Sequence, residues 1–199
     1  MTKLVFFLGP AGAGKTTLAK AVATRTKAAF FDMDILLRPA ADVIMSMHGL
    51  DPTDRDSSDY KRLCRDLGYH ITMDAALDNI ALDIDSFVVG PFTKEAANST
   101  WIENELSRIG RTLQDVEVKV VLVELANEKL YRDRILGRSS SLDDWKMEHW
   151  EQFRASLGRR NVQWPLPSTS IMNIDNSNPD IQDAISKVAQ FLYDEIRNQ

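Results

Sequence analysis

Short, uninterrupted apolar runs alternate with longer amphipathic stretches along most of the chain. A strand buried on both faces is apolar throughout rather than at every second position, so such runs are typical of a parallel sheet covered by helices. Five runs predict strands: Leu4–Leu8, Ala28–Phe31, Phe87–Val89, Val118–Val123 and Ser170–Ile174. The chain of 199 residues is long enough for one α/β domain, and we expect a single domain over residues 1–199.

Helices are predicted between the strands from the residues at their ends. A helix from Lys15 to about Thr26 follows the first strand. Thr93 is a candidate N-cap for a helix that Gly110 would end. Asn178 and Pro179 mark the start of a C-terminal helix. Its apolar positions recur at helical spacing: Ile181, Ile185, Val188, Leu192 and Ile196.

Two stretches do not fit simple connections between strands. Residues 38–82 are too long for one crossover and contain at least two helical segments, one of which we expect to start at Asp51-Pro52. Residues 132–164 are polar, rich in arginine and interrupted by glycines and by the serines 139–141. Long excursions in a compact domain are usually functional. We therefore expect a helical substrate-binding module at about 38–82 and a lid at about 132–164.

Composition and charge narrow the classes of partner. Apolar residues make up 44% and charged residues 27% of the chain, as in ordinary globular proteins. The net charge of −5 argues against nucleic acid, because nucleic-acid binding needs a concentrated basic face. No apolar stretch reaches membrane-spanning length, and Cys64, the only cysteine, permits a reducing compartment. We expect a cytoplasmic protein without a membrane or nucleic-acid partner, and the sequence identifies no protein partner.

The segment Gly9–Thr16 matches the pattern GxxxxGK[ST] at every fixed position and lies between a predicted strand and a predicted helix. Glycines let backbone N–H groups wrap around phosphate oxygens, and the helix directs its positive end at them. Lys15 places a full charge at the β- and γ-phosphates, and the Thr16 hydroxyl is positioned to hold Mg²⁺. We expect these residues to bind ATP: Gly9, Pro10, Ala11, Gly12, Ala13, Gly14, Lys15, Thr16, Thr17 and Arg132.

With this motif, the whole chain resembles the P-loop kinases of the shikimate, gluconate and chloramphenicol phosphotransferase kind. It is also similar to the broader set of small P-loop kinases and zeta-toxin-like proteins. The resemblance implies the P-loop NTPase fold, a three-layer α/β sandwich. It implies a five-stranded parallel sheet in the order 2-3-1-4-5, an inserted helical substrate module and an arginine-bearing lid.

A pair of carboxylates directly follows the second predicted strand, in Asp32-Met33-Asp34. The carboxyl ends of parallel strands line the ligand crevice, and alternation along an extended segment would turn both carboxylates the same way. Shikimate-kinase-like proteins carry this motif after the same strand. The resemblance implies that Asp32 lies on the Mg²⁺ side and that Asp34 orients or deprotonates the acceptor hydroxyl. The alternative is that Asp34 caps a helix starting at Ile35.

The third predicted strand ends without an acid and runs into Gly90 and Pro91. The Walker B carboxylate is therefore missing, which disfavours a motor ATPase and suits kinases in which the paired aspartates hold the metal. The strand also lacks the Gly-Gly-Gly of shikimate kinases, so shikimate itself is not implied. We expect Gly90 and Thr93 to face the substrate, together with Asp34 and Arg38.

Three arginines follow the fourth predicted strand, at about the place where lids of similar kinases carry them. Arginine stabilises a transferring phosphoryl group through paired hydrogen bonds. Arg134 and Arg138, which share one face if a single helix spans both, are therefore candidate catalytic residues beside Lys15, and Arg132 is a candidate ATP ligand. The alternative is a solvated basic face paired with neighbouring aspartates. For Arg159 and Arg160, solvation or ion pairing is the favoured interpretation.

The helical stretch offers further candidates for binding the acceptor. Arg38, Arg62 and Arg65 could clamp an anionic acceptor, although the segment from Asp51 to Asp66 is nearly neutral. The three histidines have no metal-ligand spacing. The aromatic residues after the serines are predicted to pack the lid against the body of the domain.

Together these patterns predict an ATP- and Mg²⁺-dependent enzyme that phosphorylates a hydroxyl group of a small molecule. The first alternative is a regulatory ATPase or switch that acts on a protein partner. The second is a kinase acting on a nucleotide-sugar or on polynucleotide ends. A GTPase is disfavoured because the sequence has no Asn-Lys-x-Asp motif, and an ABC-type ATPase because it has no Leu-Ser-Gly-Gly.

Overall fold

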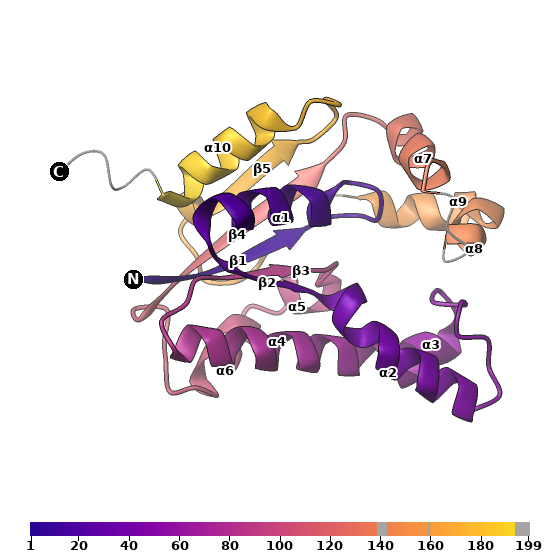
Figure 1. Ribbon diagram of the computed structural model, residues 1–199, viewed down its shortest axis with the longest axis horizontal. Helices are drawn as coiled ribbons and strands as arrows, with labels where there is room; N and C mark the ends of the chain where they lie inside the picture. Colours follow the sequence, from indigo (N-terminus) through magenta and orange to yellow (C-terminus); the bar gives the residue numbers. More distant parts are fainter. Residues whose placement is uncertain (139–142, 159, 194–199) are drawn as a thin grey trace.

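The computed structural model describes residues 1–138, 143–158 and 160–193 (Figure 1). Its centre is a five-stranded sheet in the order β2-β3-β1-β4-β5, in which every neighbouring pair is parallel. The strands are β1 (Thr2–Leu8), β2 (Ala29–Asp32), β3 (Ser86–Val89), β4 (Val116–Glu124) and β5 (Ile171–Asp175). The predicted strands and their order are confirmed.

Helices cover both faces of the sheet, which explains why its central strand is apolar without interruption. Phe7 of β1 packs in one cluster with α1 (Lys15–Thr26) and α10 (Gln182–Tyr193). Phe6 packs in the other cluster with α4 (Arg65–Ala81) and α6 (Trp101–Ser107). Figure 1 shows these two layers above and below the strands. Successive side chains of β1 thus point into opposite cores.

The helix predicted to follow an N-cap at Thr93 begins differently in the structure. Thr93 is the first residue of the short helix α5 (Thr93–Ala96) and not its N-cap, because Phe92 adopts a left-handed φ of 41° and buries its ring against Tyr69. The chain then turns before α6, so two short helices replace the single predicted one. Gly110, with a φ of 66°, does follow α6.

The C-terminal helix begins at Gln182 rather than near Asn178. The Asn178 carboxamide oxygen accepts a hydrogen bond from the Asp180 N–H, and the Asp180 carboxylate accepts one from the Gln182 N–H. These side-chain bonds hold the residues after Pro179 in turns, which delays the helix. The predicted core position Ile196 lies outside the described residues.

The helical module begins immediately after β2, earlier than residue 38. It contains α2 (Met33–Met47) and α3 (Ser58–Leu63), and α4 connects it to the sheet. A small core of its own holds it together: Leu37, Ala41, Met45, Tyr60 and Cys64. The helix expected at Asp51-Pro52 is wrong, because the Asp51 carboxylate closes a turn on the Thr53 N–H and the helix starts at Ser58, capped by Ser57.

Beyond β4 the chain forms a series of short helices at the end of the molecule where the strands terminate (Figure 1). They are α7 (Glu128–Leu136), α8 (Asp144–Glu148), α9 (Trp150–Arg154) and η2 (Ala155–Leu157). The short helix η3 (Ser168–Ser170) lies at the opposite end, directly before β5. Helix α7 ends before Gly137, so one helix does not span Arg134 and Arg138. The serines 139–141 and Arg159 lie outside the described residues. Among the helices that are described, none has the length and apolar character needed to cross a membrane.

Candidate active site

The phosphate loop leaves the carboxyl end of β1 and leads directly into α1. Gly9 has a φ of 146°, and a Cβ atom there would overlap the Val123 carbonyl oxygen on β4. Gly14 is the N-cap of α1 with a φ of 89° and offers no capping side chain. The first N–H groups of α1 therefore have no side-chain partner within the helix and remain suited to an anion.

Two residues from distant segments hold the second half of this loop. Asn176, buried just after β5, donates from its carboxamide to the Ala13 carbonyl at 2.9 Å. Arg134 of α7 donates to the Asn176 carbonyl at 2.6 Å and to the Ala13 carbonyl at 3.4 Å. Arg134 is thus anchored to the loop backbone. Asn176 was not predicted from the sequence, although it follows the end of a strand, as Asp32 does at the end of β2.

Lys15 lies at the centre of a group of charges. Its ammonium donates to the Pro10 carbonyl at 2.8 Å. Burial lowers the pKa of Lys15 to about 8; the Asp34 carboxylate opposes this shift, while the positive charges of Arg138 and Arg160 add to it. A triphosphate bound in the loop would supply the negative charge that this ammonium lacks.

Asp32 forms the link between the phosphate loop and α2. One carboxylate oxygen accepts from the Thr16 hydroxyl at 2.7 Å, and the other accepts from the Asp34 N–H at 3.0 Å as the N-cap of α2. The expected extended geometry is wrong, because Met33 and Asp34 already form the first turn of the helix. The expected alternative is also wrong in detail, because the capping residue is Asp32 and not Asp34.

Thr16 and Asp32 bring a hydroxyl and a carboxylate together beside the loop. Oxygen ligands of this kind fit Mg²⁺, which commonly takes one or two protein ligands and completes its shell with phosphate oxygens and water. Within the described ranges, no group of three or more His, Cys, Asp or Glu side chains could hold a metal on its own. The donor set therefore suits a metal that arrives with a nucleotide.

The Asp34 carboxylate has both acidic and basic neighbours. Although part of its surface is exposed, the surrounding groups desolvate it and raise its pKa, and the charge of Asp32 raises it further. The charges of Lys15, Arg55 and Lys146 act in the opposite direction. Arg55 precedes α3 and Lys146 lies on α8, so the helical module and the short helices after β4 both present a cation to Asp34.

The other predicted substrate residues differ in their placement. Gly90 is buried at the end of β3, and a Cβ atom there would press on the Phe92 ring. Thr93 is exposed at the start of α5, and Arg38 is exposed one turn after Asp34 on α2. Gly90 therefore shapes the turn after β3, while the Thr93 and Arg38 side chains reach solvent.

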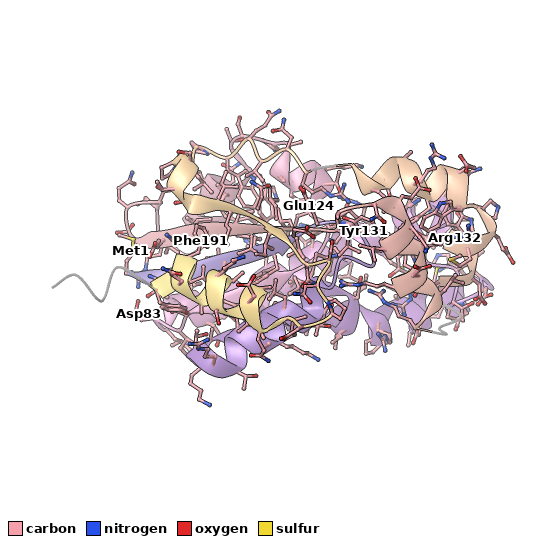
Figure 2. All side chains as sticks on the ribbon, turned by 90° about the horizontal axis from the view of Figure 1, so that it is seen from above. Met1, Asp83, Glu124, Tyr131, Arg132 and Phe191 are labelled. Carbon is pink, nitrogen blue, oxygen red and sulfur yellow. The ribbon has the colours of Figure 1, made fainter. Side chains whose placement is uncertain are left out.

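The three arginines that were predicted to lie on a lid are separated in the structure. Arg138 lies near Lys15 and its guanidinium is 3.8 Å from the Asp143 carboxylate. The Arg132 guanidinium instead lies 5.7 Å from the centre of the Trp150 ring. Figure 2 shows Arg132 at the far end of the molecule, beyond Glu124 and Tyr131. The structure does not bring Arg132 to the phosphate loop.

Comparisons with known proteins match this architecture. The family model described as "ATPase family associated with various cellular activities (AAA)" matches residues 5–38, which span β1, the phosphate loop, α1, β2 and the start of α2. No protein of curated function matches the sequence.

Solved structures match over nearly the whole chain. A provisionally assigned kinase from Chloroflexus aurantiacus has a TM-score of 0.69 at 17% identity, with 96% of each chain covered. A sugar kinase from Janibacter sp. HTCC2649 has a TM-score of 0.60 at 15% identity, covering 96% of this chain and 95% of that one. A gluconokinase from Sinorhizobium meliloti 1021 has a TM-score of 0.50 at 14% identity, with 97% of each covered.

This chain has the P-loop NTPase fold. The structural neighbours named above are described as kinases, which agrees with the sequence resemblance. The structural similarity establishes the fold. Identities of 14–17% are too low to identify the acceptor.

Two arginines of the P-loop domain's helical module form structural ion pairs. Arg65 makes two hydrogen bonds to the buried Glu95 carboxylate, at 2.9 and 3.0 Å, and its guanidinium lies 4.5 Å from the centre of the Tyr69 ring. Arg62 pairs with Asp59 on the exposed face of α3. These two arginines were predicted to bind the acceptor, but both are paired with carboxylates of the protein. Arg55, whose charge acts on Asp34, was not predicted from the sequence.

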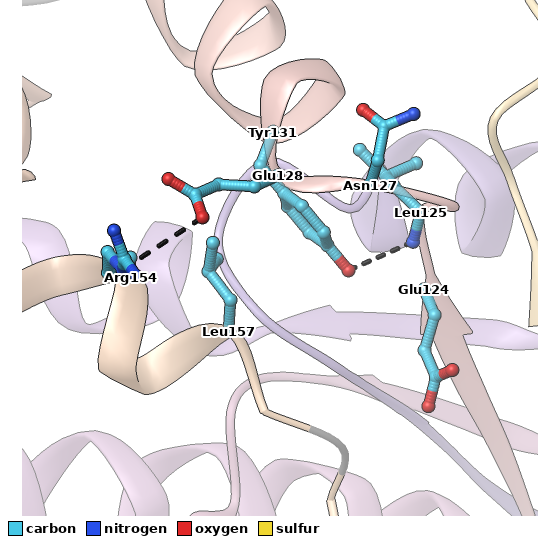
Figure 3. A pocket seen from close by; sticks show the side chains of 7 residues that line it. All are labelled: Glu124, Leu125, Asn127, Glu128, Tyr131, Arg154 and Leu157. Carbon is cyan, nitrogen blue, oxygen red and sulfur yellow. Dashed lines mark hydrogen bonds and ion pairs between the residues drawn. The ribbon is translucent and has the colours of Figure 1, made fainter.

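A cavity of about 240 Å³ lies beside the phosphate loop, between the end of β4, the start of α7 and the α9–η2 segment (Figure 3). The Leu125 N–H donates to the Tyr131 hydroxyl at 2.9 Å, and the Arg154 guanidinium lies 4.0 Å from the Glu128 carboxylate. Seven residues line it: Glu124, Leu125, Asn127, Glu128, Tyr131, Arg154 and Leu157. Two carboxylates against one guanidinium make it unsuited to a phosphate.

Proposed function

We propose that the protein transfers the γ-phosphoryl group of ATP to a hydroxyl group of a small molecule, with Mg²⁺ as cofactor. The observation that carries the proposal is the proximity of Lys15 and Asp34, whose charges shift each other's pKa. A phosphate-binding cation and a carboxylate with a raised pKa are the two groups that hydroxyl phosphorylation requires on either side of the reacting phosphorus.

The residues divide the work as follows. The backbone of Gly9–Thr16 and the Lys15 ammonium bind the phosphates, while Thr16 and Asp32 would hold Mg²⁺. Bound Mg²⁺ would neutralise charge on the phosphate oxygens. Asp34 accepts the proton of the acceptor hydroxyl as its oxygen bonds to the γ-phosphorus and the bond to ADP breaks. The products are ADP and a phosphate ester.

The pKa of Asp34 fits this task. A base must be ionised before the reaction, yet it must also bind a proton well enough to take it from a hydroxyl. Desolvation raises the pKa of Asp34, while the cations Lys15, Arg55 and Lys146 keep the ionised form accessible. The exposed part of the side chain gives an acceptor a route to it.

The test is ADP release measured with a panel of sugars, nucleosides, antibiotics, nucleotide-sugars and short oligonucleotides. We expect one class to stimulate turnover. Asp34→Asn should then lower acceptor-dependent turnover by roughly a hundredfold while Mg-ATP affinity is retained. Asp78→Asn, which changes an exposed aspartate on α4 in the same way, is the matched control.

Two other outcomes would assign the protein differently. ADP release that responds to no compound in the panel would favour the regulatory ATPase, to which the short AAA match at residues 5–38 also corresponds. Stimulation by a nucleotide-sugar or by oligonucleotide ends alone would name those as acceptors. Unchanged turnover in Asp34→Asn would refute the assignment of the base. The single cysteine and the use of ATP fit a cytoplasmic enzyme.

A further inference from the structure

Arg160 lies in the stretch that leads from η2 back towards β5. Its Nη1 donates to the Ser156 carbonyl at 3.0 Å and to the Gly158 carbonyl at 3.1 Å. Four residues further on, the Trp164 indole N–H donates to the Glu95 carbonyl at 2.9 Å. Both acceptors of Arg160 are backbone carbonyls, so its guanidinium is held in place without an ion pair to a carboxylate.

Arg160 is a half-buried arginine without a counter-charge among the described residues. Within the described part of the chain, no carboxylate lies within ion-pair distance of it, and its buried Nε has no hydrogen-bond partner. Arg65 is paired with Glu95, and Arg154 lies 3.0 Å from Glu151. Arg160 is only partly removed from water, but its buried Nε–H has no acceptor in the described structure, so the site is suited to a ligand that brings negative charge.

The surroundings of Arg160 join the two halves of the candidate active site. Its charge contributes to lowering the pKa of Lys15, which places it beside the phosphate loop. Its other charge-sensitive neighbours are the hydroxyls of Tyr69 on α4 and Tyr131 on α7. Burial raises the pKa of both tyrosines, and Asp34 raises that of Tyr69 further. Arg160 therefore lies near Lys15 and near the neutral hydroxyls of Tyr69 and Tyr131.

We propose that Arg160 is a catalytic residue that binds the phosphoryl group while it moves from ATP to the acceptor, and that it then holds the phosphate ester of the product. This inference rests on the proposed function. As the bond from phosphorus to ADP breaks and the bond to the acceptor oxygen forms, Nε–H and a free Nη–H donate to the oxygens of the transferred group. The acceptor's proton passes to Asp34, and the charge of Arg160 is unchanged throughout.

The other two arginines near the loop fit this task less well. The Arg134 guanidinium already donates hydrogen bonds to the carbonyls of Ala13 and Asn176. Arg138 has Asp143 at 3.8 Å and is 45% exposed. Only Arg160, among these three, combines a fixed position with a buried donor that has no partner in the described structure.

The experiment compares a ground-state nucleotide with a mimic of the transferring phosphoryl group. Binding of Mg-ADP, and of Mg-ADP with aluminium fluoride, is measured by calorimetry for the native protein, Arg160→Ala, Arg160→Gln and Arg160→Lys. We expect Mg-ADP affinity to change less than threefold. Affinity for the aluminium fluoride complex should fall on the order of a hundredfold in Arg160→Ala and Arg160→Gln, and less in Arg160→Lys, which keeps the charge but not the paired donors. Arg154→Ala, which removes an exposed arginine from the same segment, should match the native protein.

Native affinity for the aluminium fluoride complex in both Arg160→Ala and Arg160→Gln would overturn the proposal. Retained Mg-ADP binding shows that each variant is folded, and Arg160→Gln serves if the alanine variant is not. This experiment needs no acceptor, so it remains decisive if the acceptor panel gives no turnover. If no acceptor stimulates turnover, the kinase assignment fails. A hundredfold loss of affinity for the aluminium fluoride complex would then still show that Arg160 binds the phosphoryl group.

Discussion

The two sides of the candidate active site are built from different materials. The side proposed to bind ATP is mostly backbone: the loop Gly9–Thr16 is fixed by close packing against Val123 and by the hydrogen bond from Asn176. The acceptor side is made of long side chains, with Arg55 and Lys146 reaching Asp34 from separate segments. Backbone recognition tolerates changes in most side chains, whereas an acceptor site built from side chains can change its ligand through few substitutions.

The largest effect is expected on the ATP side, at the one side chain that the phosphates need. Lys15→Met should lower phosphoryl transfer by at least a thousandfold, because electrostatic stabilisation dominates this chemistry. Turnover is measured with the acceptor found in the panel, and Lys20→Met, an exposed lysine on α1, is the control. A folded Lys15→Met protein with turnover near the native level would contradict the assignment.

The same substitution should stabilise the protein. The pKa of Lys15 is lowered from 10.5 to about 8, so the folded state binds fewer protons than the unfolded state between these values. Stability therefore rises with pH from about 8 to 10.5, and below pH 8 the charged lysine costs up to roughly 3 kcal/mol. Lys15→Met should raise Tm at pH 7 and flatten this rise in stability above pH 8. A lower Tm at pH 7 would show that the ammonium contributes more through its bond to Pro10 than it costs.

An intermediate effect is expected where the acceptor side is anchored to the sheet. Glu95→Gln removes the partner of the largely buried Arg65, and we expect a loss of about 2–3 kcal/mol in the free energy of unfolding. Asp59→Asn makes the same chemical change in the exposed pair with Arg62 and should cost less than about 1 kcal/mol. Urea denaturation measures both. Equal losses would mean that burial does not distinguish the two pairs.

The smallest effect concerns the contact between the module and the lid region. The Lys146 ammonium lies 3.2 Å from the Asp56 carboxylate and 3.0 Å from that of Asp143. Asp56→Asn should loosen this contact, raise hydrogen exchange in α8 and α9, and change KM for the acceptor a few-fold while KM for ATP stays constant. Parallel changes in both KM values would show that this contact does not belong to the acceptor side alone.

The fold was predictable from the sequence because its strands are buried on both faces. An uninterrupted apolar run such as Val118–Val123 must be buried in a protein surrounded by water. The strand predicted from it agrees with β4 to within about two residues. Helix starts were less predictable, because local side-chain bonds compete with the helix. The Asp51 carboxylate closes a turn on Thr53, and the tertiary packing of Phe92 decides where α5 begins.

The site was predictable only where the motif is local in sequence. Gly9–Thr16 and Asp32-Met33-Asp34 are continuous segments, and the fold brings them together through the Thr16–Asp32 hydrogen bond. Arg55, Lys146 and Arg160 carry no local motif. Their importance comes from burial and from the absence or presence of a carboxylate nearby, which depends on how distant segments pack.

The position of β1 in the middle of the sheet has a consequence for the growing chain. Its neighbours are β3 and β4, and the nearer of them in sequence, beginning at Ser86, follows about 80 residues later. At a synthesis rate of roughly 5–20 residues per second, β1 waits about 4–16 seconds for a partner strand. During that time Leu4–Leu8, which is fully buried in the finished protein, is exposed on the nascent chain. The ribosome therefore releases this fully buried apolar segment well before the strands that cover it.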